Sequence, residues 1–306
     1  MEFRQFRYIL KTAEEGSISA AAQKLYISQP SLSQLIAGVE KKIGAPLFDR
    51  STVPLKPTVI GELYLETARQ ILSIARDFRQ QADDILALRK GHITIGSSPF
   101  RSTYALAPFI PRFRQQFPQI DITLVENTTR NLEQAVLRGD VDFAISLLPV
   151  DEKLFAWQEL FTEELLLALP PAHPLCAKYH LSEKNTPLPA ISLQELQDTP
   201  FILIQKEQKL HDTLLALCQK AAFLPQIQLE TRSMEAAQAM TGAGLGATLL
   251  PDTLIRCHHA TPSPCYAALA SHPQRRVVII WRKKGCLSRA ARQFIADLQV
   301  YYAKNE

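Results

Sequence analysis

The sequence predicts an N-terminal winged helix-turn-helix, a long linker helix and a C-terminal α/β domain. Near the N-terminus, two short helical stretches and a sharp turn precede a helix that begins at Pro30, the order of elements in a helix-turn-helix. Residues 61–88 then keep helical periodicity without an interior Gly or Pro. From residue 91, strand-like and helical stretches alternate, which favours an α/β domain with a largely parallel sheet. The expected divisions are residues 1–60, 61–90 and 91–306.

Composition and charge are those of an ordinary globular protein with a slightly basic N-terminus. The 306 residues are 46% hydrophobic, and the length suits two domains of roughly 100–200 residues each. The net charge of +4 is too small to establish nucleic-acid binding by itself. Residues 1–60 hold 8 basic and 5 acidic side chains, so most of the excess lies where a phosphate-binding module is predicted.

The sequence carries no pattern for export, membrane insertion or a disulfide framework. No apolar run reaches the roughly 18–20 residues that cross a bilayer, and residues 1–4 lack the charged-then-apolar layout of a signal peptide. The five cysteines are odd in number and include no Cys-x-x-Cys pair. We therefore expect a cytoplasmic protein without membrane contact, bound metal or cofactor.

Local start and stop signals place the elements of the helix-turn-helix. Its helices are expected over residues 3–13, 20–25 and 30–43, with a wing over 46–57. Pro30 suits the first turn of a helix, where its missing N–H would be unpaired anyway, and Gly44 is a natural stop. On the last helix, Leu32 and Leu35 are expected to face the core.

The start of that last helix supplies the candidate base contacts. In a helix-turn-helix, the N-terminal residues of the second helix face base edges in the major groove. Here these residues are Ser28, Gln29, Pro30, Ser31, Ser33 and Gln34. Glutamine can pair with adenine and serine with several bases, although Ser28 and Gln29 could instead cap the helix.

The wing supplies candidate phosphate contacts. Arg50, Lys56 and Thr58 would hold phosphates and so set the register of the protein on the duplex. After Ser33 the helix has no basic residue until Lys41. Few charged contacts predict a shallow salt dependence of binding and reliance on dimers or tetramers.

The predicted linker helix carries an apolar seam with alternating spacings of four and three. Its members are Tyr64, Ala68, Ile71, Ala75, Phe78, Ala82 and Ile85. The helix could lie against its own domain or pair with a second copy of the chain. We favour the pair, because a two-sided seam on a connector has no other obvious partner.

These N-terminal patterns together resemble those of the LysR-type transcription regulators. The similarity runs through residues 16–25, 28–33, 43–50 and 58–61. It continues more weakly through residues 91–96, 139–145 and 242–246. The motifs of the first 60 residues are highly specific as a set.

The resemblance implies a fold like that of periplasmic binding proteins, with two lobes around a cleft. The expected divisions are lobe I at 91–163 and 268–306, lobe II at 164–267, and chain crossings near 161–165 and 267–270. It also implies a DNA-binding regulator that a small effector modulates from the cleft. The implied partners are double-stranded promoter DNA and further copies of the chain, with RNA polymerase as another candidate.

Candidate effector contacts follow from the rule that α/β lobes bind ligands at the C-terminal ends of their strands. Residues 97–102 follow the first strand and offer N–H groups and hydroxyls to an anion, so a small organic anion is the expected effector. Arg101 could pair with its carboxylate or be a solvated surface charge. The candidates are Ser97, Ser98, Pro99, Phe100, Arg101, Ser102, Thr128, Phe201, Ile202 and Gly244.

Other functions have weaker support. A stand-alone binding protein is disfavoured by the intact 28–33 motif, and an enzyme by the lack of Gly-x-Ser-x-Gly, P-loop or His-Glu-x-x-His patterns. The glycines at 242–246 lack the spacing of a dinucleotide loop. Cys257 and Cys265, near His258 and His259, leave a redox or metal site as a less favoured alternative to an ordinary loop.

Overall fold

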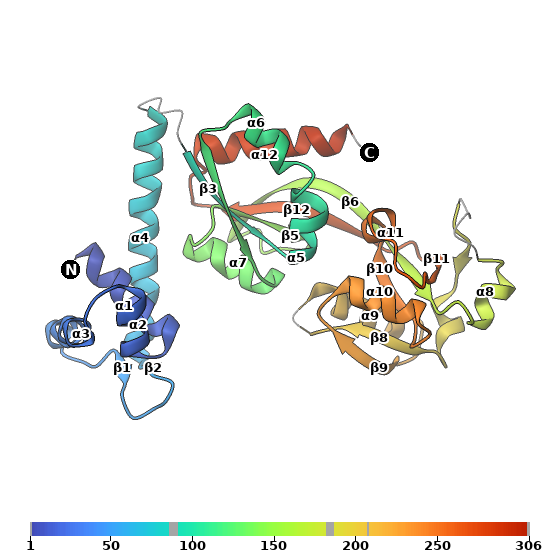
Figure 1. Ribbon diagram of the computed structural model, residues 1–306, viewed down its shortest axis with the longest axis horizontal. Coiled ribbons are helices and arrows are strands. Elements are labelled where there is room, and N and C mark those ends of the chain that lie inside the picture. The colour runs from blue at the N-terminus through green and yellow to red at the C-terminus, as the bar shows by residue number, and fades with distance from the viewer. Residues whose placement is uncertain (1, 86–90, 182–186, 207, 305–306) are drawn as a thin grey trace. The chain divides into compact units, whose positions relative to one another are not determined.

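The computed structural model of the chain describes residues 2–85, 91–181, 187–206 and 208–304 (Figure 1). They form an N-terminal and a C-terminal compact unit, which we describe separately. The expected end of the linker helix at Leu88 and the boundary at residue 90 lie outside the described residues, as do the side chains of Ala82 and Ile85. Within the described ranges, no helix has the length and apolar character to cross a bilayer.

The N-terminal unit is the predicted helix-turn-helix with a wing. Its elements are α1 (Phe3–Glu15), α2 (Ile18–Lys24), α3 (Gln29–Ile43), β1 (Phe48–Asp49), β2 (Lys56–Pro57) and α4 (Val59–Ile85). Gly16 ends α1 in the left-handed region at φ 59°, a conformation that suits glycine. The carbonyl of Gly16 accepts a hydrogen bond from Leu55 N at 2.8 Å, so the wing is tied to the α1–α2 turn.

Helix α4 uses the first part of its seam within its own unit. Tyr64 and Ala68 are buried, and the Tyr64 ring lies 5.8 Å from that of Phe6 on α1. Phe78, in the same predicted seam, is 73% exposed. The expected single seam is therefore divided, because α1 covers its N-terminal part and leaves the later part to solvent.

The C-terminal unit alternates helices and strands as predicted. It opens with β3 (Gly91–Ser97), α5 (Pro99–Arg101), the π-helical turn Ser102–Leu106, α6 (Ile110–Gln116), β4 (Ile120–Glu126), α7 (Thr129–Arg138), β5 (Phe143–Leu147) and β6 (Phe155–Leu169). It continues with α8 (Pro174–Lys178), β7 (Ala190–Ile191), the 3-10 turn Leu193–Leu196, β8 (Pro200–Ile204), α9 (Lys209–Lys220) and β9 (Gln226–Thr231). It closes with α10 (Met234–Gly242), β10 (Thr248–Pro251), α11 (Asp252–Cys257), β11 (Cys265–Leu269), β12 (Gln274–Arg282) and α12 (Arg289–Ala303).

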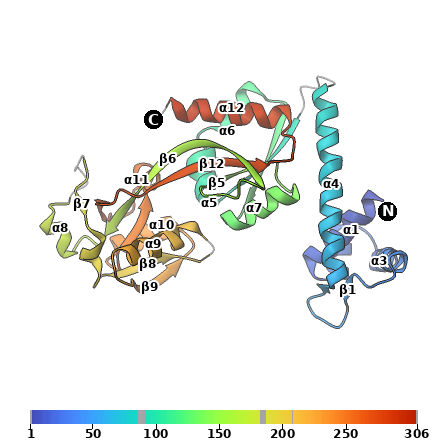
Figure 2. The same cartoon turned by 180° about the vertical axis from the view of Figure 1, so that it is seen from behind.

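Lobe I is a mixed sheet covered on both faces. The strand order is β4-β3-β5-β12-β6. Strands β3, β4 and β5 are parallel, but β12 runs antiparallel to β5 and β6, so the expected largely parallel sheet is mixed. Helices α6 and α12 cover one face and α7 the other (Figures 1 and 2).

The long strand β6 belongs to both lobes. Up to Glu164 its residues pair with β12, and from Leu165 they pair with β10 and, from Leu166, with β11. The change of partners lies within the predicted crossing at 161–165. The chain returns between Leu269, the last residue of β11, and Gln274, the first of β12. This return is slightly later than the expected 267–270, because β11 remains paired with β6 in lobe II.

Each lobe has its own apolar core. In lobe I, Phe294 of α12 packs against Phe109 at 5.1 Å and Phe113 at 4.8 Å between ring centroids. In lobe II, β8 is joined to β9 in parallel and to Ala247 through a bridge at Phe201. Strand β8 is thus interior to lobe II, which decides the environment of its side chains.

Candidate nucleic-acid interface and effector site

The start of α3 is held by a serine cap. Ser28 Oγ accepts a hydrogen bond from Ser31 N at 3.4 Å and lies 2.7 Å from Ser31 Oγ. Ser28 therefore takes the capping role that was its alternative, and Gln29 is the first helical residue. Gly44 ends the helix at φ 81°.

Helix α3 has an apolar inner face and, over residues 29–38, a polar outer face without charge; the exposed Lys41 and Lys42 follow in its last turn. Leu32, Ile36 and Val39 are buried in the core of the unit. Predicted base-contact residues lie at the opposite side: Gln29, Pro30, Ser31 and Gln34 are exposed, and Ser33 is half-buried. Leu35, expected in the core, is only partly buried against it. The outer face offers amide and hydroxyl groups, which suit hydrogen bonding to base edges.

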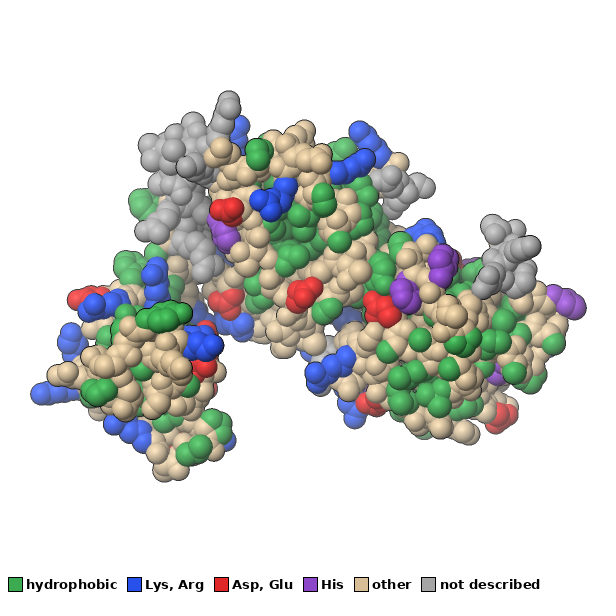
Figure 3. Space-filling view, in the orientation of Figure 1, with side chains coloured by type: hydrophobic (Ala, Val, Ile, Leu, Met, Phe, Trp, Pro, Cys, Tyr) green, Lys and Arg blue, Asp and Glu red, His purple; other side chains and the backbone are tan. Residues whose placement is uncertain are grey.

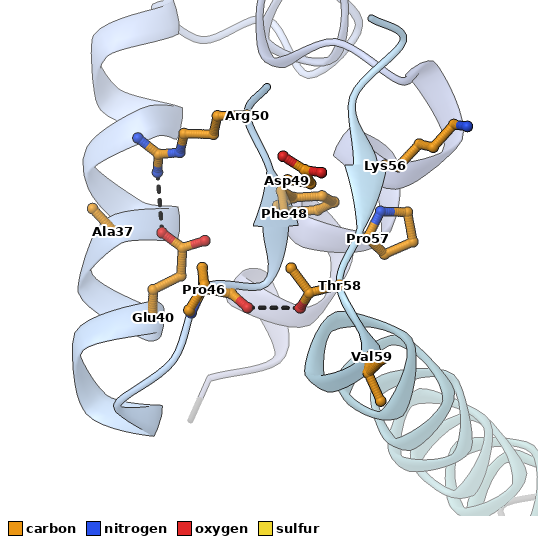
Figure 4. Close-up of a pocket in the computed structure, with 10 residues that line it drawn as sticks. All are labelled: Ala37, Glu40, Pro46, Phe48, Asp49, Arg50, Lys56, Pro57, Thr58 and Val59. Carbon is orange, nitrogen blue, oxygen red and sulfur yellow. Dashed lines mark hydrogen bonds and ion pairs between the residues drawn. The ribbon is translucent and has the colours of Figure 1, made fainter. Parts of the chain in front are cut away.

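Glu40 ties the wing to α3. Its Oε1 accepts a hydrogen bond from Leu47 N at 2.8 Å, and its Oε2 pairs with Arg50 Nη2 at 3.0 Å (Figure 4). The Arg50 side chain is still 53% exposed, and a guanidinium has five N–H donors. Arg50 is thus oriented by Glu40 and keeps donors for a phosphate.

Thr58 has a structural role at the start of α4, where the resemblance of residues 58–61 places the opening of the linker helix. Its Oγ1 donates to Pro46 O at 2.7 Å and accepts from Gly61 N at 3.0 Å, so it caps the start of α4 (Figure 4). Its hydroxyl proton is committed to Pro46 O and is not offered to a phosphate. Lys56 on β2 is exposed, as a phosphate contact requires.

An open groove lies beside the wing. Its lining is Ala37, Glu40, Pro46, Phe48, Asp49, Arg50, Lys56, Pro57, Thr58 and Val59 (Figure 4). It therefore joins the outer side of α3 to both wing strands. Lys and Arg side chains occur around much of the visible outline of this unit (Figure 3). The groove and this charge distribution suit a phosphate backbone beside the helix.

In lobe I, the predicted effector segment 97–102 follows β3 and turns into α5. Ser98 Oγ accepts a hydrogen bond from Arg101 N at 3.2 Å and caps this short helix. Ser97 is buried, and Pro99 is exposed. Phe100 is buried in the lobe II core cluster, so it anchors the segment across the lobes.

Arg101 is neither the free anion-binding group nor the solvated charge that the sequence suggested. It is 4% exposed, and its guanidinium binds Glu163 of β6 through both terminal nitrogens. Glu163 also accepts hydrogen bonds from Arg275 of β12 and from Thr253 of α11 at 3.2 Å. Burial by itself would raise the pKa of Glu163, but the charges of the two arginines outweigh it and lower the pKa to about 2.

Two of the predicted residues present unused hydroxyls. Within the described part of the chain, the buried hydroxyl oxygens of Ser102 and Thr128 have no hydrogen-bond partner. Ser102 begins the π-helical turn, a type of distortion that is frequent at functional sites. Thr128 follows β4, which neighbours β3. These hydroxyls are suited to a polar ligand or water.

The predicted lobe II contacts do not form a ligand surface. Phe201 and Ile202 are fully buried in the lobe II core, because β8 is an interior strand. Gly244 has φ 97° and open space around it, so it serves the turn after α10 rather than a close approach. The close approaches belong to Gly242 and Gly246, whose added Cβ atoms would meet Pro262 O at 1.9 Å and Pro200 O at 2.6 Å.

The sequence prediction missed Lys209 and Glu133, which link the lobes. Lys209 is the first residue of α9 in lobe II, and Glu133 lies on α7 in lobe I. Lys209 Nζ is 3.1 Å from Glu133 Oε1. A single lysine and a single glutamate 76 positions apart form no motif, so no pattern in the sequence points to this pair.

Cys257 and Cys265, the cysteines of the less favoured redox or metal site, are both free thiols. The thiol of Cys265 lies within hydrogen-bonding reach of Cys176 on α8, and Cys257 is exposed. Burial, with the hydrogen bond to Cys265, raises the pKa of Cys176 to about 12, which disfavours a reactive thiolate. Among the described residues, no cluster of His, Cys, Asp and Glu is arranged to hold a metal ion.

Comparison with known proteins places this chain in a family. Residues 3–62 match the bacterial regulatory helix-turn-helix protein family of the lysR type, and residues 87–301 match the LysR substrate binding domain. The HTH-type transcriptional regulator YwbI of Bacillus subtilis (strain 168) is 30% identical over 303 residues, covering 98% of this chain and 97% of that protein.

Two further relatives extend the likeness over the whole chain. The transcriptional dual regulator GltC of Bacillus subtilis (strain 168) is 27% identical and covers 100% of this chain and 99% of that protein. A full-length OxyR variant from Pseudomonas aeruginosa superposes with a TM-score of 0.72 at 26% identity, covering 98% of this chain and 94% of that one. The chain belongs to the LysR family of bacterial helix-turn-helix transcriptional regulators.

Proposed function

We propose that this regulator binds double-stranded promoter DNA through the exposed face of α3 and that a small effector between its lobes modulates the binding. The observation that carries the DNA part is the polar outer face of a firmly capped α3. Gln29, Ser33 and Gln34 would read base edges from the major groove. Arg50 and Lys56 would hold the backbone on either side of the wing groove.

Homo-oligomers would present α3 to two half-sites at once. Val59, Leu63, Ile74 and Phe78 on α4 are large apolar side chains that remain largely exposed. They suit pairing with the same surface of a second copy, since exposed apolar patches mark association sites. A DNA-bound oligomer would then regulate transcription by contacting or obstructing RNA polymerase.

The effector is proposed to bind on the lobe I side near the ends of β3 and β4. Ser98, Ser102 and Thr128 supply hydroxyls there, and those of Ser102 and Thr128 lack protein partners among the described residues. Arg101, Phe201 and Ile202 are not part of this proposed site, since an ion pair or a core occupies them. The effector site thus draws mainly on polar groups of lobe I.

The test is fluorescence anisotropy of the full chain with DNA from immediately upstream of its gene, beside scrambled DNA, at two salt concentrations. A lost bidentate base contact costs ~1–3 kcal/mol, so Gln34→Ala should raise Kd for the upstream DNA by about 5–150-fold. Gln219→Ala, an exposed glutamine at the end of α9, is the control and should leave Kd unchanged. Equal, weak binding to both DNAs would contradict the proposal.

A further inference from the structure

Lys209 reaches from lobe II into a set of oxygens on lobe I. Its Nζ donates to Glu133 Oε1 at 3.1 Å, to Leu147 O at 2.6 Å and to Pro149 O at 3.1 Å. An ammonium group has three N–H donors, so these acceptors satisfy all of them. The Lys209 side chain is 23% exposed, which means that the contact is shielded but open to exchange with solvent.

The acceptors form a built site rather than a chance surface contact. Ser146 is buried and its Oγ donates to the same Glu133 oxygen at 3.2 Å, which fixes the carboxylate. Leu147 is the last residue of β5, the strand between β3 and β12. The oxygens therefore lie at the C-terminal edge of the parallel strands, where α/β lobes bind ligands.

The chemistry of this site selects a primary ammonium group. All its ligating atoms are oxygens, one of them from a carboxylate, and they converge on one nitrogen. A carboxylate from the ligand would be repelled by Glu133, and a quaternary ammonium would offer no N–H to the carbonyls.

We infer that Glu133 with the carbonyl oxygens of Leu147 and Pro149 is an ammonium subsite, filled by Lys209 until an effector with a primary ammonium group displaces it. This inference rests on the proposed effector site. The effector can still be the expected organic anion if it is a zwitterion, because the released Lys209 then pairs with the ligand carboxylate and both partly buried charges keep partners.

Displacement would also release a link between the lobes. One turn away on each helix, Arg130 of α7 pairs with Asp212 of α9 at 3.4 Å, but both side chains are largely exposed and contribute little. The better shielded pair at Lys209 is therefore the main polar link between α7 and α9 in the described structure. Its exchange for a ligand ammonium couples effector binding to the relation of the lobes.

The test is chemical rescue of the full-length Lys209→Ala variant, followed by thermal unfolding. The variant should lose about 2–4 °C in Tm, the shift for one lost interaction in a domain of this size. Ethylammonium chloride should restore at least half of that loss, and tetramethylammonium chloride at equal ionic strength should not. The wild type should need higher ethylammonium concentrations, because its tethered Lys209 competes.

Controls separate the subsite from general effects. Lys220→Ala, an exposed lysine on the same helix, should keep its Tm and show no ethylammonium response. Adding Glu133→Gln to Lys209→Ala should abolish the rescue.

Equal Tm responses to the two salts, or equal Tm responses of wild type and Lys209→Ala, would overturn the subsite. If the variant does not fold, Glu133→Gln alone must lower Tm, and an unchanged Tm overturns the inference. The DNA anisotropy test does not involve Lys209 or Glu133. Failure of that test would therefore count against the proposed DNA binding and not against the ammonium subsite.

Discussion

Replacing Glu163 with glutamine should destabilise the C-terminal unit far more than any exposed charge of the same type. The Glu163 side chain is fully buried and is shared by Arg101 and Arg275, which are themselves buried. Glutamine keeps the shape but removes the charge and turns an amide donor toward the arginine donors. Breaking a buried ion pair by removing one partner costs about 3–5 kcal/mol, because the remaining charge is left uncompensated.

Glu159 provides a matched control on the same strand. It pairs with Arg276 through two nitrogens, but the side chains are 39% and 49% exposed. Exposed pairs contribute about 0–1 kcal/mol, so Glu159→Gln should lower Tm by at most about 4 °C. Glu163→Gln should lower it by about 6–20 °C at the same scale.

The assay is thermal unfolding of both variants and the wild type by calorimetry at pH 7 and at acid pH. The pKa of Glu163 is lowered from 4.5 to about 2 in the folded protein, so its stabilising effect is complete above pH 4.5 and disappears as the pH falls toward 2. The gap between wild type and Glu163→Gln should therefore narrow at acid pH. Equal losses for the two variants at pH 7 would refute the burial argument.

Two other substitutions test packing and association. Gly242→Ala places a Cβ 1.9 Å from Pro262 O, where backbone must move, and should lower the free energy of unfolding by about 1–3 kcal/mol. Gly38→Ala, on the exposed side of α3, meets nothing within 4 Å and should raise it by up to ~1 kcal/mol. Similar effects of the two substitutions in thermal unfolding would contradict the contact geometry. Phe78→Ser removes a 73% exposed ring from α4 and should shift sedimentation toward monomer, while unchanged oligomers would place the interface elsewhere.

The helix-turn-helix could be predicted closely because its signals are local. The serine cap at residue 28 and Pro30 in the first turn define the start of α3, and Gly44 defines its end. Each signal lies within two residues of the helix end that it marks. The linker helix was also predicted from local periodicity, but the partner of its apolar seam was not. Whether Tyr64 meets Phe6 or a second copy depends on how α1 folds back, which periodicity alone does not encode.

The mixed topology of lobe I could not be read from strand patterns. Strands β5 and β12 are both apolar runs, and such runs look alike whether they pair in parallel or antiparallel. Their order in the sheet depends on β6, which leaves lobe I in mid-strand at Glu164. The crossing at 161–165 was predicted from the resemblance, but the antiparallel direction in which β12 pairs with β5 and β6 depends on the tertiary fold and is not encoded in any one strand.

The effector site shows why residue type was a poor guide there. Phe201 and Ile202 suited an apolar pocket wall, but an interior strand buries both faces, so the same residues became core. Arg101 suited an anion, but its partner Glu163 stands 62 positions away in the sequence. A charged side chain can bind a ligand only if the fold leaves its charge unpaired or in a pair that the ligand can exchange, and pairing is a property of the tertiary structure. The same reasoning directs attention to Lys209 and Glu133, whose pairing across the lobes is shielded but can still be exchanged for a ligand.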